Sequence, residues 1–205
     1  MRKVIRKLIF IIKLINKGRF LHETGWLRSV ECRMPVNKNG EEIPWFTYSF
    51  IYFLHEKINK NMSIFEYGSG NSTIYFSSRV TKICSLEHDE GWYQKMKDKL
   101  PKNVEYHFKP LYDCYADFIK CTNKRYDIII IDGRERVACA KNAPEYLKDD
   151  GVIILDNSLR EKYKVGLEYL SDLGFKRIDF RGLNPAGFVL TVTSIFYKKN
   201  NCFNL

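Results

Sequence analysis

Hydrophobic and polar positions follow one another along most of the chain in alternating strand and helix patterns. Short apolar runs at residues 64–67, 83–86, 104–108, 126–131 and 152–155 predict strands. Segments with helical spacing at 72–80, 90–100, 137–147 and 161–173, and a loop with a short helix at 112–120, connect and follow them. Strands that alternate with helices predict a mostly parallel sheet, and the unbroken run Ile128–Ile131 predicts a central strand buried on both faces.

The alternation stops after residue 173. Phe175–Phe180 and Thr191–Tyr197 both have strand patterns, and the loop between them contains no helix pattern. Two successive strands without a crossover helix predict an antiparallel pair that closes the parallel sheet. The pattern as a whole predicts an α/β fold with a Rossmann-like sheet of seven strands.

Three segments are expected along the chain. Residues 61–200 form the domain that contains the sheet, and residues 1–20 form a basic amphipathic segment. Between them, residues 21–60 form an extension that is irregular up to residue 47, where Pro35, Gly40 and Pro44 interrupt any regular pattern, and helical from there to about residue 60. Its aromatic stretch Trp45–Tyr48 is expected to act as a lid or acceptor-binding element, with core packing as the alternative.

A glycine turn follows the first predicted strand. Residues 66–73 read E-Y-G-S-G-N-S-T, and Gly68 and Gly70 let the backbone approach a ligand closely. The polar residues after the glycines open a helix whose free N–H groups face the turn. Glu87 ends the next strand, nineteen residues after Gly68, where a Rossmann-type unit presents a carboxylate to ribose hydroxyls. These features predict a nucleoside pocket, although close packing of a strand on a helix can also require small residues.

The acid-first form of the turn, Glu66 followed by G-S-G, resembles the first motif of class I S-adenosylmethionine-dependent methyltransferases. A dinucleotide fingerprint would have a third glycine where this chain has Thr73, and dehydrogenase domains lack the terminal strand pair. The resemblance covers roughly residues 60–200 and implies S-adenosylmethionine as cofactor, with its amino group near Glu66 and its ribose on Glu87. The cofactor-binding residues that it implies are Glu66, Gly68, Ser69, Gly70, Asn71, Ser72, Thr73, Glu87, His88 and Asp132.

Polar residues also follow the fourth and fifth predicted strands. Asp132 ends one of them, and Asp156 and Asn157 end the other, so that two carboxylates and an amide are expected at neighbouring strand ends. Oxygen ligands of this kind suit Mg²⁺. The arrangement resembles the catechol-type, metal-dependent O-methyltransferases, which implies that all three residues are catalytic and hold the metal.

The resemblance to the catechol-type enzymes is incomplete. Their catalytic lysine would fall where this chain has Arg134, Glu135 and Arg136, and arginine stays protonated and cannot act as a general base. Three alternatives remain open: the metal alone activates the hydroxyl, the arginines bind an anionic substrate, or no metal is used. The two acids and the amide can also serve only as helix caps or turn residues.

The net charge of +10 is concentrated at one end of the chain. Residues 1–20 contain seven basic and no acidic residues, which leaves the other 185 residues with a charge of only +3. A nucleic-acid-binding domain is expected to carry a basic patch on its own surface, so nucleic acid is an unfavoured partner. Six cysteines without a C-x-x-C pair are typical of a reduced, cytoplasmic protein.

The basic segment has the pattern of an amphipathic helix. Its uninterrupted apolar run at residues 8–12 is too short to span a bilayer, and no small-residue cleavage site of a signal peptide follows it. Residues 1–17 are therefore expected to lie on an anionic membrane surface, which would place the protein at the inner membrane surface, or to pack on the domain or on a second copy in an oligomer.

These features predict a methyltransferase that acts on a hydroxyl of a small molecule or glycan, with Asp132 orienting or deprotonating the acceptor. The chain lacks the Asn/Asp-Pro-Pro-aromatic motif and the Pro-Cys nucleophile of two classes of nucleic-acid methyltransferase. The alternatives are a binding module that holds cofactor or partner without turnover, and an RNA methyltransferase that uses the basic segment.

Overall fold

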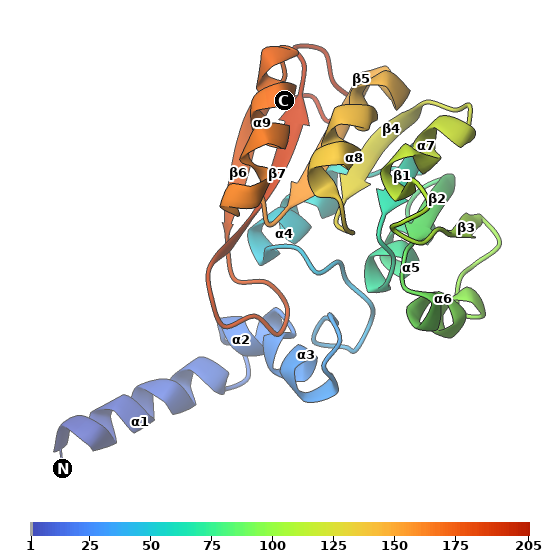
Figure 1. Cartoon of the computed structure of the whole chain (residues 1–205). Coiled ribbons are helices and arrows are strands. Elements are labelled where there is room, and N and C mark those ends of the chain that lie inside the picture. The colour runs from blue at the N-terminus through green and yellow to red at the C-terminus, as the bar shows by residue number, and fades with distance from the viewer. Residues whose placement is uncertain (1) are drawn as a thin grey trace.

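The computed structural model describes residues 2–205, apart from the side chains of Arg2, Lys3 and Leu8, and contains one seven-stranded sheet (Figure 1). The strand order is β3-β2-β1-β4-β5-β7-β6, and β7 runs antiparallel to both of its neighbours. The predicted α/β, Rossmann-like sheet with its terminal antiparallel pair is therefore confirmed. The strands are β1 (Ser63–Tyr67), β2 (Lys82–Glu87), β3 (Val104–Phe108), β4 (Tyr126–Ile131), β5 (Leu147–Asp156), β6 (Lys176–Gly182) and β7 (Thr191–Tyr197).

Helices cover both faces of this sheet. Residues of α7, α8 and α9 pack in one core cluster with one face of the strands, and residues of α4 and α5 pack in the other cluster (Figure 1). The helices are α1 (Arg2–Ile15), α2 (Phe20–Glu23), α3 (Trp26–Cys32), α4 (Tyr48–Lys57), α5 (Asn71–Ser77), α6 (Glu90–Lys97), α7 (Phe118–Cys121), α8 (Arg136–Asn142) and α9 (Lys164–Asp172), with 3-10 turns at Tyr115–Asp117, Ala143–Tyr146 and Glu161–Tyr163.

Strand β4 has the central place that its isoleucines predict. It pairs in parallel with β1 on one side and β5 on the other. Because successive side chains of a strand point to opposite faces, Ile129 and Ile131 belong to one core cluster and Ile128 and Ile130 to the other. An all-apolar run is the composition that a strand covered on both faces requires.

The extension before the sheet contains more regular structure than its sequence predicts. The expected irregular stretch 21–47 includes most of α2 and all of α3, and both helices are too short to give a clear periodic signal. Gly25 separates them at φ +80°, and an added Cβ there would lie 2.3 Å from the carbonyl carbon of Asn37. The backbone at Val36 and Asn37 therefore packs directly against the backbone of Gly25.

The predicted helix 137–147 is too long at its C-terminal end. Helix α8 ends at Asn142, and the next four residues form a 3-10 turn around Pro144. Proline lacks an N–H group, so Pro144 cannot donate the hydrogen bond that would continue the α-helix. The chain instead enters β5 at Leu147, which pairs with Tyr126, so this strand begins earlier than the predicted Val152.

Segments on either side of residues 61–200 contribute to the same core. Phe50 and Leu54 of α4 are fully buried in the cluster that contains Ile128 and Ile130. At the other end Phe203 is buried, and the Cys202 N–H donates a hydrogen bond of 2.7 Å to the Asp150 carbonyl oxygen. Among the residues that the structure describes, no helix has the length and apolar character that a membrane span needs.

Candidate functional site

A cleft of about 630 Å³ opens at the carboxyl ends of β1, β2 and β4. Ligands of open parallel sheets bind at this edge, at the point where the strand order changes direction. In this sheet that point lies between β1 and β4. Six of the residues predicted to bind a cofactor line the cleft, and they are Gly68, Ser69, Ser72, Glu87, His88 and Asp132.

The glycine turn gives the cleft a floor of bare backbone. Gly68 has φ +97°, and its N–H donates a hydrogen bond of 2.8 Å to the Leu86 carbonyl oxygen. A Cβ at this position would lie 2.9 Å from the Gly133 nitrogen, closer than real Cβ atoms come to backbone. The turns after β1 and β4 therefore touch through two glycines, and no side chain at either position separates a ligand from the backbone.

Glu66 is buried beneath the glycine turn, where it binds neighbouring hydroxyl groups, and it does not line the cleft. The hydroxyl groups of Ser72, Thr73 and Ser85 donate hydrogen bonds to its carboxylate at 2.5, 2.6 and 3.0 Å. Burial raises the pKa of Glu66 to about 7, although the three hydroxyl groups oppose this shift. In this structure the carboxylate links the turn and α5 to β2, and its contact with a cofactor amino group stays a prediction.

Three other predicted cofactor residues also lie outside the cleft lining. The Asn71 side chain donates a hydrogen bond of 2.8 Å to the Pro35 carbonyl oxygen, so it anchors the extension. The Thr73 hydroxyl accepts a hydrogen bond of 3.1 Å from the Gly70 N–H at the start of α5. Short polar side chains at a helix start commonly satisfy backbone groups there.

We expect Glu66→Gln to change the pH dependence of stability. Glutamine stays neutral at every pH, whereas the wild-type carboxyl has a pKa of 4.5 in the unfolded chain and of about 7 in the folded protein. The folded wild-type protein therefore loses stability relative to the variant as pH rises across that window, by roughly 3 kcal/mol in total, with no further change above it. Urea denaturation of both proteins across this range measures the difference, and a difference that is the same at every pH would contradict the raised pKa.

Glu87 lies on the cleft wall in the place expected for a ribose ligand. Its Oε1 accepts hydrogen bonds from the His88 and Asp89 N–H groups at 2.8 and 3.0 Å. Its Oε2 accepts one of 2.6 Å from the Ser69 hydroxyl. The backbone and the glycine turn thus fix the carboxylate in one orientation.

Two aromatic residues that the sequence did not point to support this wall, and one of them lines the cleft. The Trp92 indole N–H donates a hydrogen bond of 3.0 Å to the Ser69 carbonyl oxygen, and Trp92 lines the cleft. The Tyr106 hydroxyl lies 2.8 Å from the Ser69 hydroxyl. The helix start at Asp89, whose carboxylate accepts a hydrogen bond of 2.7 Å from the Trp92 N–H, is the sequence signal that could have pointed to the tryptophan.

A second cavity of about 360 Å³ adjoins the cleft. Asp132, Arg136, Arg160 and Trp45 line both spaces. The second cavity adds Asp156, Asn157 and Asn184, so it is lined almost entirely by polar side chains. The three residues predicted at the strand ends therefore do come together.

Arg136 lies between the two carboxylates. Its Nη2 donates hydrogen bonds to the Asp132 Oδ1 at 2.9 Å and to the Asp132 carbonyl oxygen at 2.6 Å. Its Nη1 donates one of 2.5 Å to the Asp156 carbonyl oxygen and lies 3.8 Å from the Asp156 carboxylate. Its Nε donates one of 3.0 Å to the Gly133 carbonyl oxygen, so the guanidinium is nearly buried at the centre of the cluster.

The guanidinium changes what the two acids can bind. Burial raises the pKa of both Asp132 and Asp156, and the positive charge of Arg136 opposes that rise. The amide of Asn157 and the hydroxyl of Thr193 donate hydrogen bonds to the Asp156 carboxylate as well. The positive charge that balances these carboxylates is therefore already present, and the residues as arranged do not fit the expected Mg²⁺.

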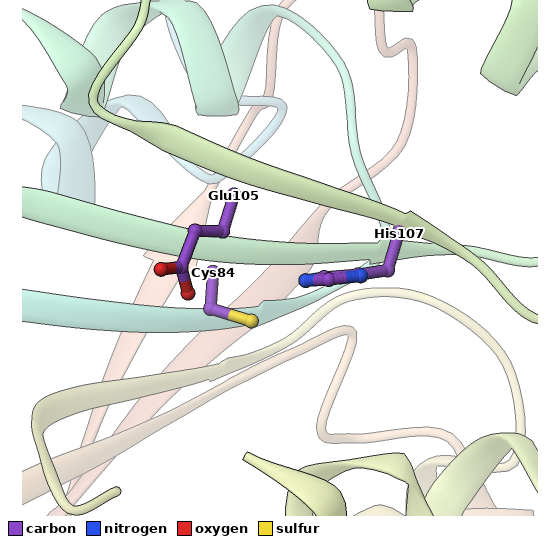
Figure 2. Close-up of side chains that lie close together, drawn as sticks. All are labelled: Cys84, Glu105 and His107. Atoms are coloured by element: carbon purple, nitrogen blue, oxygen red, sulfur yellow. The ribbon is translucent and has the colours of Figure 1, made fainter.

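A separate group of metal-ligating residue types lies at the β3 edge of the sheet. Figure 2 shows Cys84, Glu105 and His107 on two neighbouring strands. Their potential ligand atoms lie within 4.8 Å of one another. The Glu105 carboxylate, however, already pairs with Lys82 at 2.5 Å and with Lys124 at 3.0 Å. Two ammonium groups beside this carboxylate repel a metal cation. The three residues therefore form part of an ion-paired edge of the sheet and do not suit a metal.

Comparison with known proteins shows which solved structures share this fold. No protein-family model and no curated protein sequence matches the chain. The chain is similar in structure to the precorrin-6y C5,15-methyltransferase of Geobacter metallireducens, with 15% sequence identity and a TM-score of 0.60 over 83% of this chain and 96% of that one. A protein from Streptococcus mutans solved in complex with SAH matches with 16% identity and a TM-score of 0.52 over 71% and 93%.

A third similar structure is spermidine synthase from Thermotoga maritima, with 16% identity and a TM-score of 0.53 over 73% of this chain and 56% of that one. Identities this low show the fold alone. The chain has the Rossmann-like methyltransferase fold, and the names of these structures do not agree on a substrate.

Proposed function

We propose, from this fold and these two cavities, that the protein is an S-adenosylmethionine-dependent methyltransferase that acts on a hydroxyl group of a small molecule or glycan. One observation carries the proposal. The cleft with the glycine turn and Glu87 and the polar cavity with Asp156 and Asn157 meet at Asp132. Such a pair of spaces suits two reactants that must be aligned with each other.

The residues of the cleft fit the cofactor. Its volume lies in the usual range for ligand sites, its floor at Gly68 is bare backbone, and its wall presents a fixed carboxylate at Glu87. Glu87 would bind ribose hydroxyls, and Trp92 would cover one side of the ligand. When bound, S-adenosylmethionine supplies the methyl group that is transferred.

Asp132 is the residue best placed to orient the acceptor and to take up its proton. It ends β4 and lines both cavities, and its side chain is partly exposed to them. A raised pKa brings a carboxylate closer to the value that suits a general base near neutral pH. Arg136 keeps this carboxylate in place and supplies positive charge beside it, so the proposed reaction uses no metal.

Trp45 and Asn184 shape the acceptor side. Trp45 is 43% exposed and lines both cavities from the segment before α4, which supports the expected lid or acceptor-binding role. An exposed indole face can pack on a sugar ring or another flat acceptor, while Asn184, Asn157 and Arg160 can hydrogen-bond to its polar groups. This combination supports a polar, hydroxyl-rich acceptor.

The proposal is tested by separating cofactor binding from transfer. Calorimetry with SAH is expected to show binding to the wild-type protein and, within a few-fold, to Asp132→Asn. Transfer of labelled methyl groups to a panel of catechols, sugars and lipid-linked glycans, with and without Mg²⁺, is expected to fall by about 100-fold or more in that variant.

Asp113→Asn, which changes a carboxylate in an exposed ion pair with Lys109, is the matched control and should transfer at the wild-type rate. Absence of SAH binding to the folded wild-type protein would refute the proposal. Equal transfer by wild type and Asp132→Asn would refute the role of Asp132. Binding of SAH by the wild-type protein without transfer to any acceptor would favour a binding module.

A further inference from the structure

Helix α1 presents an apolar side that nothing in the described structure covers. Val4, Ile5, Ile11, Ile12 and Ile15 gather on this side, and each is at least 41% exposed. The helix extends away from the sheet and its covering helices (Figure 1). A contiguous exposed apolar surface of this kind marks a binding face.

The opposite side of α1 is strongly basic. The first twenty residues contain seven lysines and arginines and no acids, whereas the remainder of the chain has a charge of only +3. With 14 residues the helix is about 21 Å long, shorter than the roughly 30 Å hydrocarbon core of a bilayer. An amphipathic, cationic helix of this length lies in the plane of a membrane surface and does not cross it.

A second exposed apolar feature lies on the loop between β6 and β7. Phe188, Val189 and Leu190, here called the 188–190 loop, are 74%, 74% and 67% exposed. The Trp26 indole N–H donates a hydrogen bond of 2.8 Å to the Gly187 carbonyl oxygen, and the Trp26 and Phe188 rings meet edge to face at 5.1 Å. Trp26 begins α3, which follows α1 and α2 closely in the chain, so the loop contacts the segment from which the basic helix extends (Figure 1).

The 188–190 loop also leads to the acceptor side of the site. Val189, Leu190 and the exposed Leu159 line a cavity of about 270 Å³ together with Asn157, Arg160 and Asn184. The latter three residues line the polar acceptor cavity as well. An apolar approach therefore opens directly beside the place where an acceptor hydroxyl is expected.

We propose that the protein docks on an anionic lipid membrane through the apolar side of α1 and the 188–190 loop, with the acceptor side of its site next to the lipid headgroups. The position of the acceptor rests on the proposed function, but docking itself does not. Charge favours lipid over a second copy of the chain, because two copies would bring together two segments of seven positive charges each. Each basic residue near an anionic surface strengthens binding by roughly fivefold.

Co-sedimentation of the full chain with vesicles tests the proposal. Binding to vesicles of equimolar phosphatidylglycerol and phosphatidylcholine is expected to be at least about tenfold stronger than to phosphatidylcholine alone, and to weaken with added salt. Ile12→Asp should lower the partition coefficient by about tenfold or more, because it puts a charge in the apolar side. Phe10→Asp adds the same charge to the basic side and is the matched control, with an expected loss of roughly fivefold, which is the effect of one charge alone.

The loop is tested in the same assay. Val189→Asp is expected to weaken vesicle binding severalfold. Leu173→Asp should not, because Leu173 follows α9, three residues before β6 begins, and therefore lies at the opposite edge of the sheet from the cleft. Calorimetry with SAH on the same samples is expected to give the wild-type affinity in every variant, which keeps docking separate from the proposed function.

Four results would overturn docking on lipid. The first is equal binding of wild type to both kinds of vesicle. The second is equal loss in Ile12→Asp and Phe10→Asp. The third is a wild-type protein that is dimeric by light scattering without vesicles and becomes monomeric in Ile12→Asp. The fourth is a wild-type protein that binds RNA with a steep salt dependence and does not bind vesicles.

Discussion

Gly68→Ala is expected to weaken SAH binding by about 100-fold or more, equivalent to roughly 2.7 kcal/mol. The added Cβ would lie 2.9 Å from the Gly133 nitrogen and 3.1 Å from its Cα, so the turns after β1 and β4 must move apart. Both turns line the cleft, and their separation displaces the backbone that a ligand would lie against. Calorimetry with SAH measures the loss, and thermal unfolding shows whether the variant is folded.

Gly174→Ala is the matched control for this substitution. Gly174 has φ +79°, in the same left-handed region, but nothing lies within 4 Å of its added Cβ. Both variants should lose about 1 kcal/mol of stability from the backbone conformation alone. Only Gly68→Ala should lose affinity for SAH, and a folded Gly68→Ala with wild-type affinity would remove the glycine turn from the binding site.

Arg136→Met is expected to destabilise the protein by about 3–5 kcal/mol near pH 8. The substitution keeps an unbranched apolar stem but leaves the carboxylates of Asp132 and Asp156 without the guanidinium between them. Their pKa values, already raised by burial, should rise further. The folded variant then binds protons more readily than the unfolded chain, so the defect should grow as pH increases and shrink toward pH 5.

Urea denaturation near pH 5 and near pH 8 measures this dependence. Arg134→Met is the control, because Arg134 also lines the cleft but is exposed, and its loss should change stability by about 0.5 kcal/mol or less. Addition of Mg²⁺ should leave the melting temperature of the wild-type protein unchanged. A clear increase would show that a cation binds despite Arg136, and would restore the metal site that the sequence suggested.

The fold could be predicted closely because its determinants are local. The four isoleucines of β4, the glycine turn after β1 and the missing helix between the last two strands each leave a mark on adjacent residues. Short helices and element ends were harder to predict, as α2, α3 and the early start of β5 show. In those places Gly25, Pro144 and strand pairing decide the structure, and they override the periodicity of the sequence.

Within the candidate site, the sequence by itself determined which strand ends carry chemical groups. It placed Glu87, Asp132 and Asp156 at one edge of the sheet, because parallel strands bring their carboxyl ends together. It could not determine what each group would face. That Glu66 points to three hydroxyl groups beneath the turn depends on how α5 and β2 pack around β1.

Only the tertiary structure decided that Arg136 would fill the space between two acids, one of them four and the other twenty residues away. It likewise joined Trp26 to the 188–190 loop across more than 160 residues of sequence. Periodicity reports which side of an element is buried, but not which side chain from another element meets it. Which side chains meet depends on the packing of elements that lie far apart in the sequence. In this site it decides whether the two acids face a guanidinium or are free to bind a metal.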